Sequence, residues 1–226
     1  MKKLGIWVAA SLMLFCRADV ANAKDYIPKT LAEKLKTEYK IDSEELSNKG
    51  AEDFITDLAA DAFNVVRIEN ISSKNVEKGF DLLMKSRFLL ERIAKFTIGT
   101  SFKNLNKEEQ EKVINDYLPK DLYKLFLSKF SDYKTSEFEV TGSRKKSSTQ
   151  VEVNSILKVK NAMKIVWTVR LTQEGSVKVY DVTHNGISCR KTLKSVYENR
   201  MGKRSNKDRK GLQGKELFEK LWEKKK

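Results

Sequence analysis

The last predicted strand of the chain reads Val177-Lys178-Val179-Tyr180-Asp181-Val182-Thr183-His184-Asn185-Gly186-Ile187-Ser188. Val177 and Val179 alternate with Lys178 and Tyr180, which is the period of a strand with one dry and one wet face. Val182, following Tyr180, makes the second face partly apolar as well. The stretch therefore predicts a strand that closes a sheet, and the segments before it predict the other strands.

Three segments upstream show the same alternation of apolar and polar residues. Their apolar members are Phe138 and Val140 in the first, Val151, Val153, Leu157 and Val159 in the second, and Met163, Ile165, Trp167, Val169 and Leu171 in the third. The links at Gly142–Ser148, Asn161–Ala162 and Gln173–Ser176 are short, so consecutive strands are expected to run antiparallel. Together the four strands predict an antiparallel meander.

The chain before the sheet is predicted to be helical. Residues 51–68 place apolar side chains at helical spacing, which indicates an amphipathic helix. Residues 76–98 form a longer segment with a broad apolar face, and Gly99 follows it as a helix stop. This second segment is expected to be one helix with more apolar width than a single neighbour needs.

Two further helix starts are expected before the sheet. Asn106 and Glu109 have the spacing of a capping box, in which each side chain bonds a free backbone N–H of the other residue. Pro119 is preset for a first helical turn and is expected to open the next helix. The helical region is expected to continue to about residue 133.

Two more helices are expected after the sheet, at residues 192–201 and 215–224, with a charged loop at 202–211 between them. Helices before and after a meander make an α+β fold, with a helical layer packed on one face of a four-stranded antiparallel sheet. Neither an internal repeat nor a separating linker is present in the sequence. Residues 24–226 are therefore expected to form a single domain.

The N-terminus has the layout of a secretory signal peptide. Lys2 and Lys3 precede an apolar run that ends near Cys16, and Ala21-Asn22-Ala23 supplies the small residues of a cleavage site. Residues 1–23 are therefore expected to be a signal peptide that directs export of the chain. The remaining chain keeps one cysteine, Cys189, so no intrachain disulfide is expected and stability must come from a core.

The chain is strongly basic, with a formal net charge of +14. Residues 190–226 hold 14 basic and 5 acidic side chains, so most of the excess lies at the C-terminal end. One interpretation is attraction to an anionic surface such as lipid headgroups. The other is an ordinary solvated face in a lysine-rich chain, and this second interpretation is the one we favour from the sequence.

Catalytic and metal-binding patterns are missing from the sequence. His184 and Cys189 are five residues apart, and alternation along an extended chain places them on opposite faces. A zinc site needs three or four His, Cys or carboxylate ligands. The sequence has no phosphate-binding glycine loop and no nucleophile elbow. We therefore expect no enzyme activity, no metal site and no cofactor.

The closing strand resembles the end of the sheet in the MlaC family, also called the toluene-tolerance family. Members of that family typically read aromatic-x-Val-Tyr-Asp-Val-x-x-x-Gly-Val/Ile-Ser, followed by a basic helix. Val179–Val182, Gly186–Ser188 and Lys191 onward match this pattern. The chain departs from it at Val177, where the family usually has Trp, and at His184, where it has an aliphatic residue.

The resemblance covers most of residues 50–226. It includes Arg92–Gly99 before the Asn106–Gln110 helix start, Arg170–Gly175 at the last hairpin, and Gly211-Leu212 with Leu217 and Leu221 near the end. It implies a lipid pocket between the helices and the sheet, which holds phospholipid acyl chains while the headgroup stays near solvent. A lipid with roughly 25 to 30 methylenes needs such a shield in water, since each buried methylene contributes about 0.8 kcal/mol.

The function that the resemblance implies is that of a periplasmic phospholipid carrier. Such a carrier shuttles lipids between the outer and inner membranes as the soluble component of an ABC-type lipid transport system. The implied partners are phospholipid as cargo, an inner-membrane MCE-domain protein of the ABC transporter, and an outer-membrane lipoprotein. We expect a monomer that binds no nucleic acid.

The pocket wall is expected to come from residues on the dry faces of the helices and strands. These are Leu89, Ile93, Phe96, Tyr117, Phe126, Val153, Leu157, Ile165, Trp167, Val169 and Val179. Tyr180, Asp181 and Gly186 in the motif are expected to be structural, with Gly186 in a tight bend and the other two finding polar partners near the sheet edge.

Two alternatives from other classes remain open at this stage. An NTF2-like exported enzyme has a similar arrangement of helices and a curved sheet, and its acid-base group would fall on Asp181 or His184. A basic binding module for an anionic polymer would use the positive C-terminal region, and its binding would depend steeply on salt.

Overall fold

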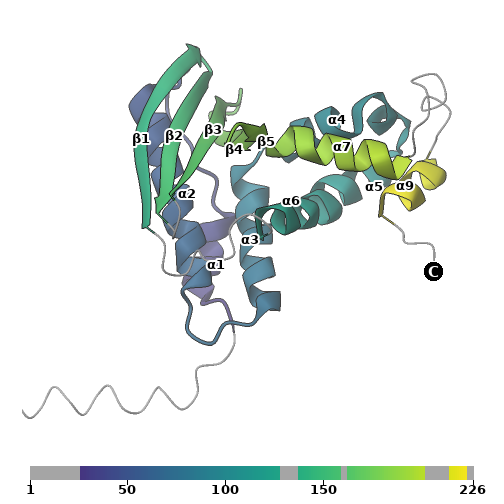
Figure 1. Cartoon of the computed structure of the whole chain (residues 1–226), viewed down its shortest axis with the longest axis horizontal. Coiled ribbons are helices and arrows are strands. Elements are labelled where there is room, and N and C mark those ends of the chain that lie inside the picture. Colours follow the sequence, from purple (N-terminus) through teal and green to yellow (C-terminus); the bar gives the residue numbers. More distant parts are fainter. Residues whose placement is uncertain (1–25, 128–136, 159–161, 202–213, 223–226) are drawn as a thin grey trace, which may run out of the picture.

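The computed structural model describes residues 26–127, 137–158, 162–201 and 214–222 (Figure 1). Its helices are α1 (Lys29–Lys36), α2 (Asn48–Val66), α3 (Ser73–Arg87), α4 (Leu90–Ile98), the 3-10 helix η2 (Gly99–Asn104), α5 (Lys107–Lys112), the π-helical turn η3 (Val113–Tyr117), α6 (Leu118–Leu127), α7 (Cys189–Met201) and α9 (Gly214–Trp222). The predicted signal peptide at 1–23 and the predicted loop at 202–211 lie outside the described residues.

The strands form one antiparallel sheet in which neighbours in sequence are neighbours in space. They are β1 (Glu137–Ser147), β2 (Gln150–Lys158), β3 (Met163–Leu171), β4 (Val177–His184) and β5 (Ile187–Ser188), in the order β1-β2-β3-β4-β5. The expected meander is confirmed, but within the described ranges it has five strands where the sequence predicted four. The extra strand arises because the predicted closing strand folds back on itself.

The fold-back occurs at Asn185 and Gly186, which have φ angles of 48° and 79°. A two-residue hairpin turn with positive φ at both positions is the geometry that Asn-Gly favours. It pairs His184 with Ile187 across the two strands. The expectation that Gly186 occupies a tight bend is therefore confirmed.

The first strand is longer than predicted. The turn expected at Gly142–Ser148 is wrong, because β1 continues to Ser147 and only Ser148 and Thr149 form the turn. The pairing with β2 shifts between Val140 and Gly142, where β1 carries an irregularity. Such a bulge interrupts the alternation of apolar and polar residues on which the sequence prediction depended.

The single helix expected at 76–98 is wrong, because α3 and α4 are separate. Phe88 between them is extended, with φ −114° and ψ 147°. It forms a parallel bridge with Val179 of β4, and the Leu89 N–H donates to the Val179 carbonyl at 2.9 Å. A contact with the sheet therefore interrupts the helix at a place without glycine or proline. The stop at Gly99 is confirmed, since Gly99 caps α4 with φ 69°.

The capping box at the start of α5 is confirmed. The Glu109 N–H donates to Asn106 Oδ1 at 2.9 Å, and the Asn106 N–H donates to Glu109 Oε2 at 2.9 Å. The new helix expected at Pro119 is wrong, because α5, η3 and α6 are continuous and Pro119 lies within this run. Proline lacks an N–H and its ring crowds the carbonyl four residues back. The π-helical turn before it, where Leu118 N–H bonds the Val113 carbonyl, widens the helix there.

Helix α1, which the sequence pattern did not predict, is held by a buried carboxylate. Asp61 of α2 is fully buried and lies 2.5 Å from Lys34 Nζ of α1 and 3.3 Å from Arg87 of α3. The Ser86 hydroxyl also donates to the Leu35 carbonyl at 2.5 Å. These polar contacts fix α1 against the pair of helices that it covers.

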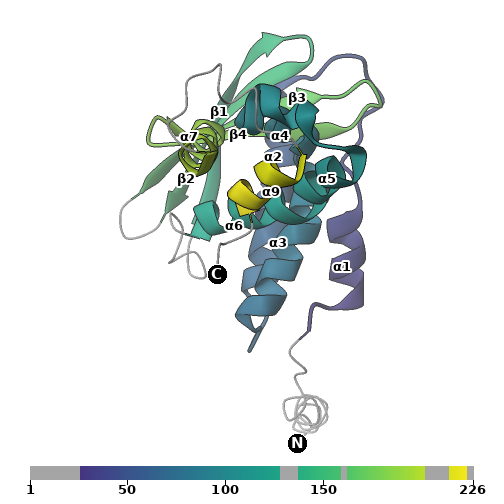
Figure 2. The same cartoon turned by 90° about the vertical axis from the view of Figure 1, so that its right-hand side faces the viewer.

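The helices cover one face of the sheet and extend beyond its β5 edge (Figure 1). Helix α2 packs against β1 and β2, while α3, α4 and α7 contact β4. Figure 2 looks onto the far end of the molecule, where α9 lies beside α5 and α6. The predicted α+β architecture, a helical layer on one sheet face, is therefore confirmed.

Candidate functional site

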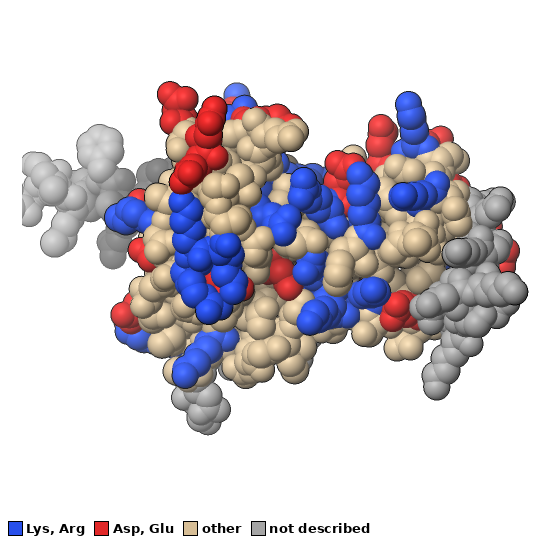
Figure 3. Space-filling view, turned by 90° about the horizontal axis from the view of Figure 1, so that it is seen from above, with Lys and Arg blue, Asp and Glu red and all other residues tan. Residues whose placement is uncertain are grey.

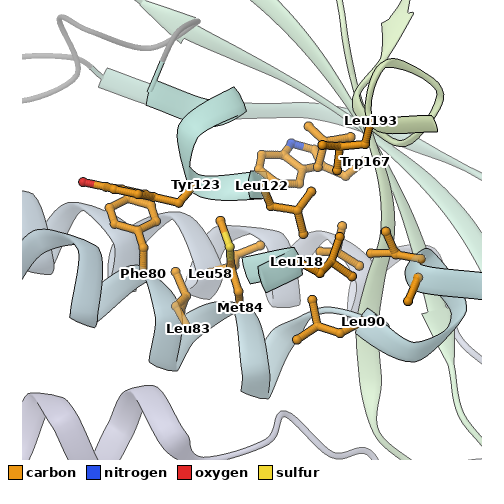
Figure 4. Close-up of a cluster of buried hydrophobic side chains, with 14 of the residues drawn as sticks. Leu58, Phe80, Leu83, Met84, Leu90, Leu118, Leu122, Tyr123, Trp167 and Leu193 are labelled. Atoms are coloured by element: carbon orange, nitrogen blue, oxygen red, sulfur yellow. The ribbon is translucent and has the colours of Figure 1, made fainter. Parts of the chain in front are cut away.

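An apolar pocket lies between the helical layer and the sheet. It is lined by Leu58, Ala59, Ala62, Phe63 and Val66 of α2, by Phe80, Leu83 and Met84 of α3, by Phe88 between α3 and α4, by Leu122, Leu125 and Phe126 of α6, by Phe138, Leu157, Ile165, Trp167 and Val182 of the sheet, and by Cys189 of α7. In Figure 4, Leu58 of α2, Leu83 and Met84 of α3, Leu122 of α6 and Trp167 of β3 lie around the same space. None of the described residues in this wall carries a charged side chain.

Local sequence explains why space is left in this region. Ala59 and Ala62 are both part of the pocket wall, one helical turn apart on α2, and their small side chains leave room that a larger residue would fill. Opposite lies the sheet, where the Trp167 indole N–H donates to the Ser155 hydroxyl at 2.9 Å. The polar atom of Trp167 is thus satisfied within the sheet.

The size of the cavity limits what it holds as it stands. It encloses about 90 Å³, whereas pockets for ligands of ordinary size run to about 300–1,000 Å³. A ligand with two acyl chains therefore requires the walls to move apart. Since the lining side chains are apolar, such a movement breaks no hydrogen bond between them.

Four of the predicted site residues lie in this pocket wall: Phe126, Leu157, Ile165 and Trp167. Phe126 comes from α6 and the other three from β2 and β3. Ile165 and Trp167 alternate on one face of β3, as the sequence pattern indicated. The structure thus brings together one predicted helix residue and three predicted strand residues.

The other seven predicted residues lie away from this pocket. Val153, Val169 and Val179 are fully buried in the core, and Ile93 is 2% exposed. Leu89 borders a different groove, while Phe96 packs under Arg190. Tyr117 contacts the rings of Phe218 and Trp222, 5.1 Å from each. The dry face of the sheet is longer than the pocket, so a buried residue on that face does not necessarily line the pocket. Contact of these seven residues with a ligand stays a prediction.

Most of the helical wall was missed by the sequence reasoning. The predicted stripe in residues 51–68 contains Leu58 and Ala62, which line the pocket, but also Phe54 and Val65, which are fully buried outside it. Helical periodicity identifies the buried side of a helix. Periodicity does not show which neighbouring element the buried side faces. That depends on how α2 packs against both the sheet and α3.

The motif residue Asp181 serves the start of α7. Its Oδ1 accepts from the N–H groups of Val182 at 2.9 Å and Arg190 at 3.1 Å, and its Oδ2 accepts from the Ser188 hydroxyl at 2.6 Å. Ser188 Oγ in turn accepts from the Lys191 N–H at 3.1 Å. The expected structural role of Asp181 is confirmed, because three donors occupy its carboxylate.

Tyr180, expected to find a polar partner, lies between two arginines instead. The guanidinium carbons of Arg170 and Arg190 lie 4.4 Å and 3.9 Å from its ring centre. Arg190 also lies 3.8 Å from the Phe96 ring, and Lys194 lies 5.2 Å from that same ring. Cation–π contacts of this kind tie β3, β4, α4 and α7 together. Figure 3 shows basic side chains spread across the face that joins the sheet to the α4 and α7 side.

A second, polar groove of about 960 Å³ lies beyond Phe88, which borders both cavities. Its walls mix charges of both signs, including Glu38, Arg92, Arg170 and Lys178. The Glu38 carboxylate accepts from Lys178 Nζ at 2.5 Å and from the Ser176 hydroxyl at 2.7 Å. These two hydrogen bonds, that from Lys178 first, hold the pKa of Glu38 below its ordinary value. This groove is therefore wet, in contrast to the apolar pocket.

Across residues 26–127, 137–158, 162–201 and 214–222, no group of three or more His, Cys, Asp or Glu side chains is arranged to hold a metal ion. Within the same ranges, no helix combines the length and the apolar character needed to cross a bilayer.

Comparison with known proteins agrees with the fold. A family model described as the MlaC protein matches residues 56–209. A phospholipid-binding protein from Ralstonia solanacearum, solved in complex with a phospholipid, is similar in structure, with a TM-score of 0.53 and 16% identity over 68% of this chain and 88% of that one. No curated protein sequence matches the chain. Because the family match spans more than half of its residues, the chain belongs to the MlaC family.

Proposed function

We propose that this protein is a phospholipid carrier of the periplasm. It moves lipids between the outer and inner membranes as the soluble component of an ABC-type transport system. The observation that carries the proposal is the pocket itself, because every residue of its wall is apolar and it lies between two separate layers of the fold. A carrier needs a dry interior and walls that part, and it needs no chemical step.

The acyl chains of the cargo occupy this pocket after its walls move apart. Phe126, Leu157, Ile165 and Trp167 contact them from α6 and the sheet, and the α2 and α3 side chains contact them from the opposite wall. Burial of roughly 25 methylenes at about 0.8 kcal/mol each is more than enough to offset the cost of separating apolar walls. The similarity to a protein solved with a phospholipid supports this assignment.

Membership of the MlaC family supports the remaining parts of the proposal. The partners are an inner-membrane MCE-domain protein linked to an ABC transporter and an outer-membrane lipoprotein. The signal peptide at residues 1–23 delivers the chain to the compartment between them. The protein is not an enzyme, in keeping with the use of Asp181 as a helix cap.

Native mass spectrometry of protein purified from cells expressing the full chain tests the proposal. We expect adducts with the mass of a phospholipid, which organic extraction then releases and identifies. Protein without adducts, which also takes up no lipid from phospholipid vesicles after delipidation, would contradict the carrier function.

A matched pair of variants locates the cargo. Ala62→Trp places a large ring in the cavity, and we expect it to lower the phospholipid content at least tenfold, because overpacking leaves no room for a chain. Ala32→Trp introduces the same ring on α1, outside the pocket wall, and is expected to retain wild-type lipid content. Equal loss in both variants would place the cargo elsewhere.

A further inference from the structure

The hairpin between β4 and β5 carries an unusual surface residue. Ile187 is 63% exposed, and among the described residues only Tyr26, at 54%, is another large apolar side chain with such exposure. The Asn185–Gly186 turn, with positive φ at both residues, sets Ile187 at the tip of this hairpin. Exposure of a large aliphatic side chain at a turn has no folding benefit.

Strand register places Ile187 next to the apolar pocket. Ile165 of β3 is opposite His184 of β4, which is opposite Ile187 of β5. Residues directly opposite each other in an antiparallel sheet share a face. Ile165 lines the pocket and is 2% exposed, so the row of three leads from the pocket wall to the molecular surface. Cys189, two residues beyond Ile187, lines the pocket as well.

Two lysines flank the hairpin. The Asn185 N–H donates to the Lys164 carbonyl at 3.4 Å, and the Lys191 N–H donates to the Ser188 hydroxyl at 3.1 Å. Both lysine side chains are exposed, and neither forms an ion pair with another residue of the described ranges. The backbone contacts thus place two residues with exposed lysine side chains next to the apolar tip of the hairpin.

We propose that the tip Ile187, with Lys164 and Lys191, is a contact site for an anionic phospholipid membrane. Ile187 enters the boundary between headgroups and acyl chains, and the lysines bind the lipid phosphates. Flexible lysines suit a fluid surface of phosphates, whereas a protein partner is recognised through a close-packed core rich in aromatic residues and Arg. One protruding side chain with two lysines does not supply such a core.

The site goes beyond the proposed carrier function, because it concerns where the protein meets a bilayer rather than what it holds. Contact at this point brings the outer end of the Ile165–His184–Ile187 row to the membrane surface. Acyl chains then pass between bilayer and pocket beside the sheet margin without crossing bulk water.

Vesicle co-sedimentation with full-length processed protein tests the proposal. We expect binding to vesicles of phosphatidylcholine with phosphatidylglycerol, and weaker binding to phosphatidylcholine alone. Lys164→Gln and Lys191→Gln should each lower the affinity for the anionic vesicles about fivefold. Ile187→Ser should lower it about tenfold and should also weaken the residual binding to neutral vesicles.

Matched controls separate this site from the general positive charge of the chain. Lys74→Gln and Lys78→Gln change the charge equally on exposed positions of α3, and Tyr26→Ser removes the other exposed apolar side chain. These variants should bind vesicles like the wild type. Equal losses in the controls, or no wild-type binding to the anionic vesicles, would overturn the proposal.

Phospholipid content, measured by native mass spectrometry on the same samples, is the second measurement. Ile187→Ser should retain its cargo while losing vesicle affinity, which supports a membrane contact separate from the pocket. Loss of cargo together with unchanged vesicle binding would instead assign Ile187 to the pocket and overturn the membrane site. A wild-type protein that binds vesicles but never carries lipid would contradict the carrier function and leave the membrane site supported.

Discussion

Helix α6 borders two buried regions that are held in different ways. Toward the sheet, Leu122 and Leu125 face the cavity among side chains that are all apolar. Toward α7 and α9, Asp121 Oδ2 accepts hydrogen bonds from the Tyr197 hydroxyl at 3.0 Å and from the Trp222 indole at 3.2 Å. One helix therefore has an apolar cavity on one side and a hydrogen-bonded centre on the other.

The region between α6, α7 and α9 is held together by hydrogen bonds and ring contacts. Arg200 donates to Asp121 Oδ2 at 3.2 Å and to the Leu221 carbonyl at 3.0 Å, which ties α7 to both α6 and α9. The ring of Trp222 lies 5.1 Å from that of Tyr117 and 5.6 Å from that of Tyr197. We call Asp121, Tyr197, Arg200 and Trp222 the Asp121 cluster.

The difference shows how one helix is fixed on one side and borders an apolar cavity on the other. Apolar contacts have no preferred direction, so a movement of the cavity wall would leave no polar group unpaired. Hydrogen bonds to a buried carboxylate are directional, and breaking them leaves unpaired groups at a large cost. The Asp121 cluster thus fixes α6 rigidly on the side that faces away from the pocket.

The largest effect is expected from removing the centre of the Asp121 cluster. Asp121→Ala leaves the hydroxyl of Tyr197 and the indole N–H of Trp222 without their acceptor, and should lower the free energy of unfolding by about 3 kcal/mol. Urea denaturation measures this change. Asp116→Ala, at an exposed position one turn earlier, should change it by less than about 0.5 kcal/mol. A loss in Asp121→Ala as small as in the control would contradict the rigid-support interpretation.

A pair of leucines on α6 compares close packing with the cavity wall. Leu118 is fully buried and outside the pocket wall, so Leu118→Ala should cost about 3 kcal/mol. Leu125 is only half-buried and already borders empty space, so Leu125→Ala should cost about 1 kcal/mol. Chemical denaturation of both variants gives the comparison. Equal costs would mean that the cavity wall is packed as tightly as the core.

Tyr197 gives the cluster a dependence on pH. Burial, and then the nearby Asp121 carboxylate, raise the pKa of Tyr197 well above the ordinary value of 10.0. A raised pKa in the folded state means that this stability is complete below about pH 10 and is lost as the pH rises further. Tyr197→Phe should cost about 1 kcal/mol at neutral pH through the lost hydrogen bond. The difference in free energy of unfolding between the wild type and this variant should become smaller above about pH 10. Ionisation of Tyr197 then favours unfolding of the wild type, and the variant has no such group.

Denaturation curves of both proteins at about pH 7, 9 and 11 check this dependence. The difference between the two proteins is the relevant quantity, since the lysines titrate equally in both. A deficit that stays constant up to about pH 11 would show that Tyr197 is not buried against Asp121.

The smallest effect is expected at an ion pair outside both regions. Glu38→Gln removes the carboxylate bonded to Lys178 and Ser176, and should cost less than about 1 kcal/mol at neutral pH because the pair is partly exposed. Because the pKa of Glu38 is lowered in the folded protein, this contribution to stability is present above about pH 4.5, the ordinary pKa of a glutamate. The contribution is lost as the pH falls below that value. Thermal unfolding at neutral and acid pH measures the difference, which should vanish in acid. A larger effect than that of Tyr197→Phe would contradict the ranking of the two sites.

The sequence was sufficient wherever local chemistry decides. Asn106 and Glu109 form the capping box that their spacing predicts, and Gly99 ends α4 as expected. Ile165 and Trp167 alternate on the dry face of β3 as their period indicates. Each of these features depends on neighbours within a few residues or on the two faces of one strand. Each can therefore be predicted from the sequence.

Prediction failed where a distant part of the chain decides. Phe88 leaves the helical path to pair with Val179, roughly ninety residues later, and the residues around Phe88 do not encode this break. The pocket wall depends on distant contacts too: four of the eleven predicted residues line this pocket, and ligand contact by the other seven stays a prediction. Whether a buried side chain meets a cavity or the core depends on how two layers meet.

The amino-acid sequence by itself determined the antiparallel meander, the helical layer and the family motif at residues 177–188, because periodicity, turns and caps are local properties. Only the tertiary structure decided that Ala59 and Ala62 leave a cavity opposite Trp167, and that Ile187 stands exposed at its margin. The physical reason is that a cavity is a property of several packed elements together, and no single segment of the chain contains it.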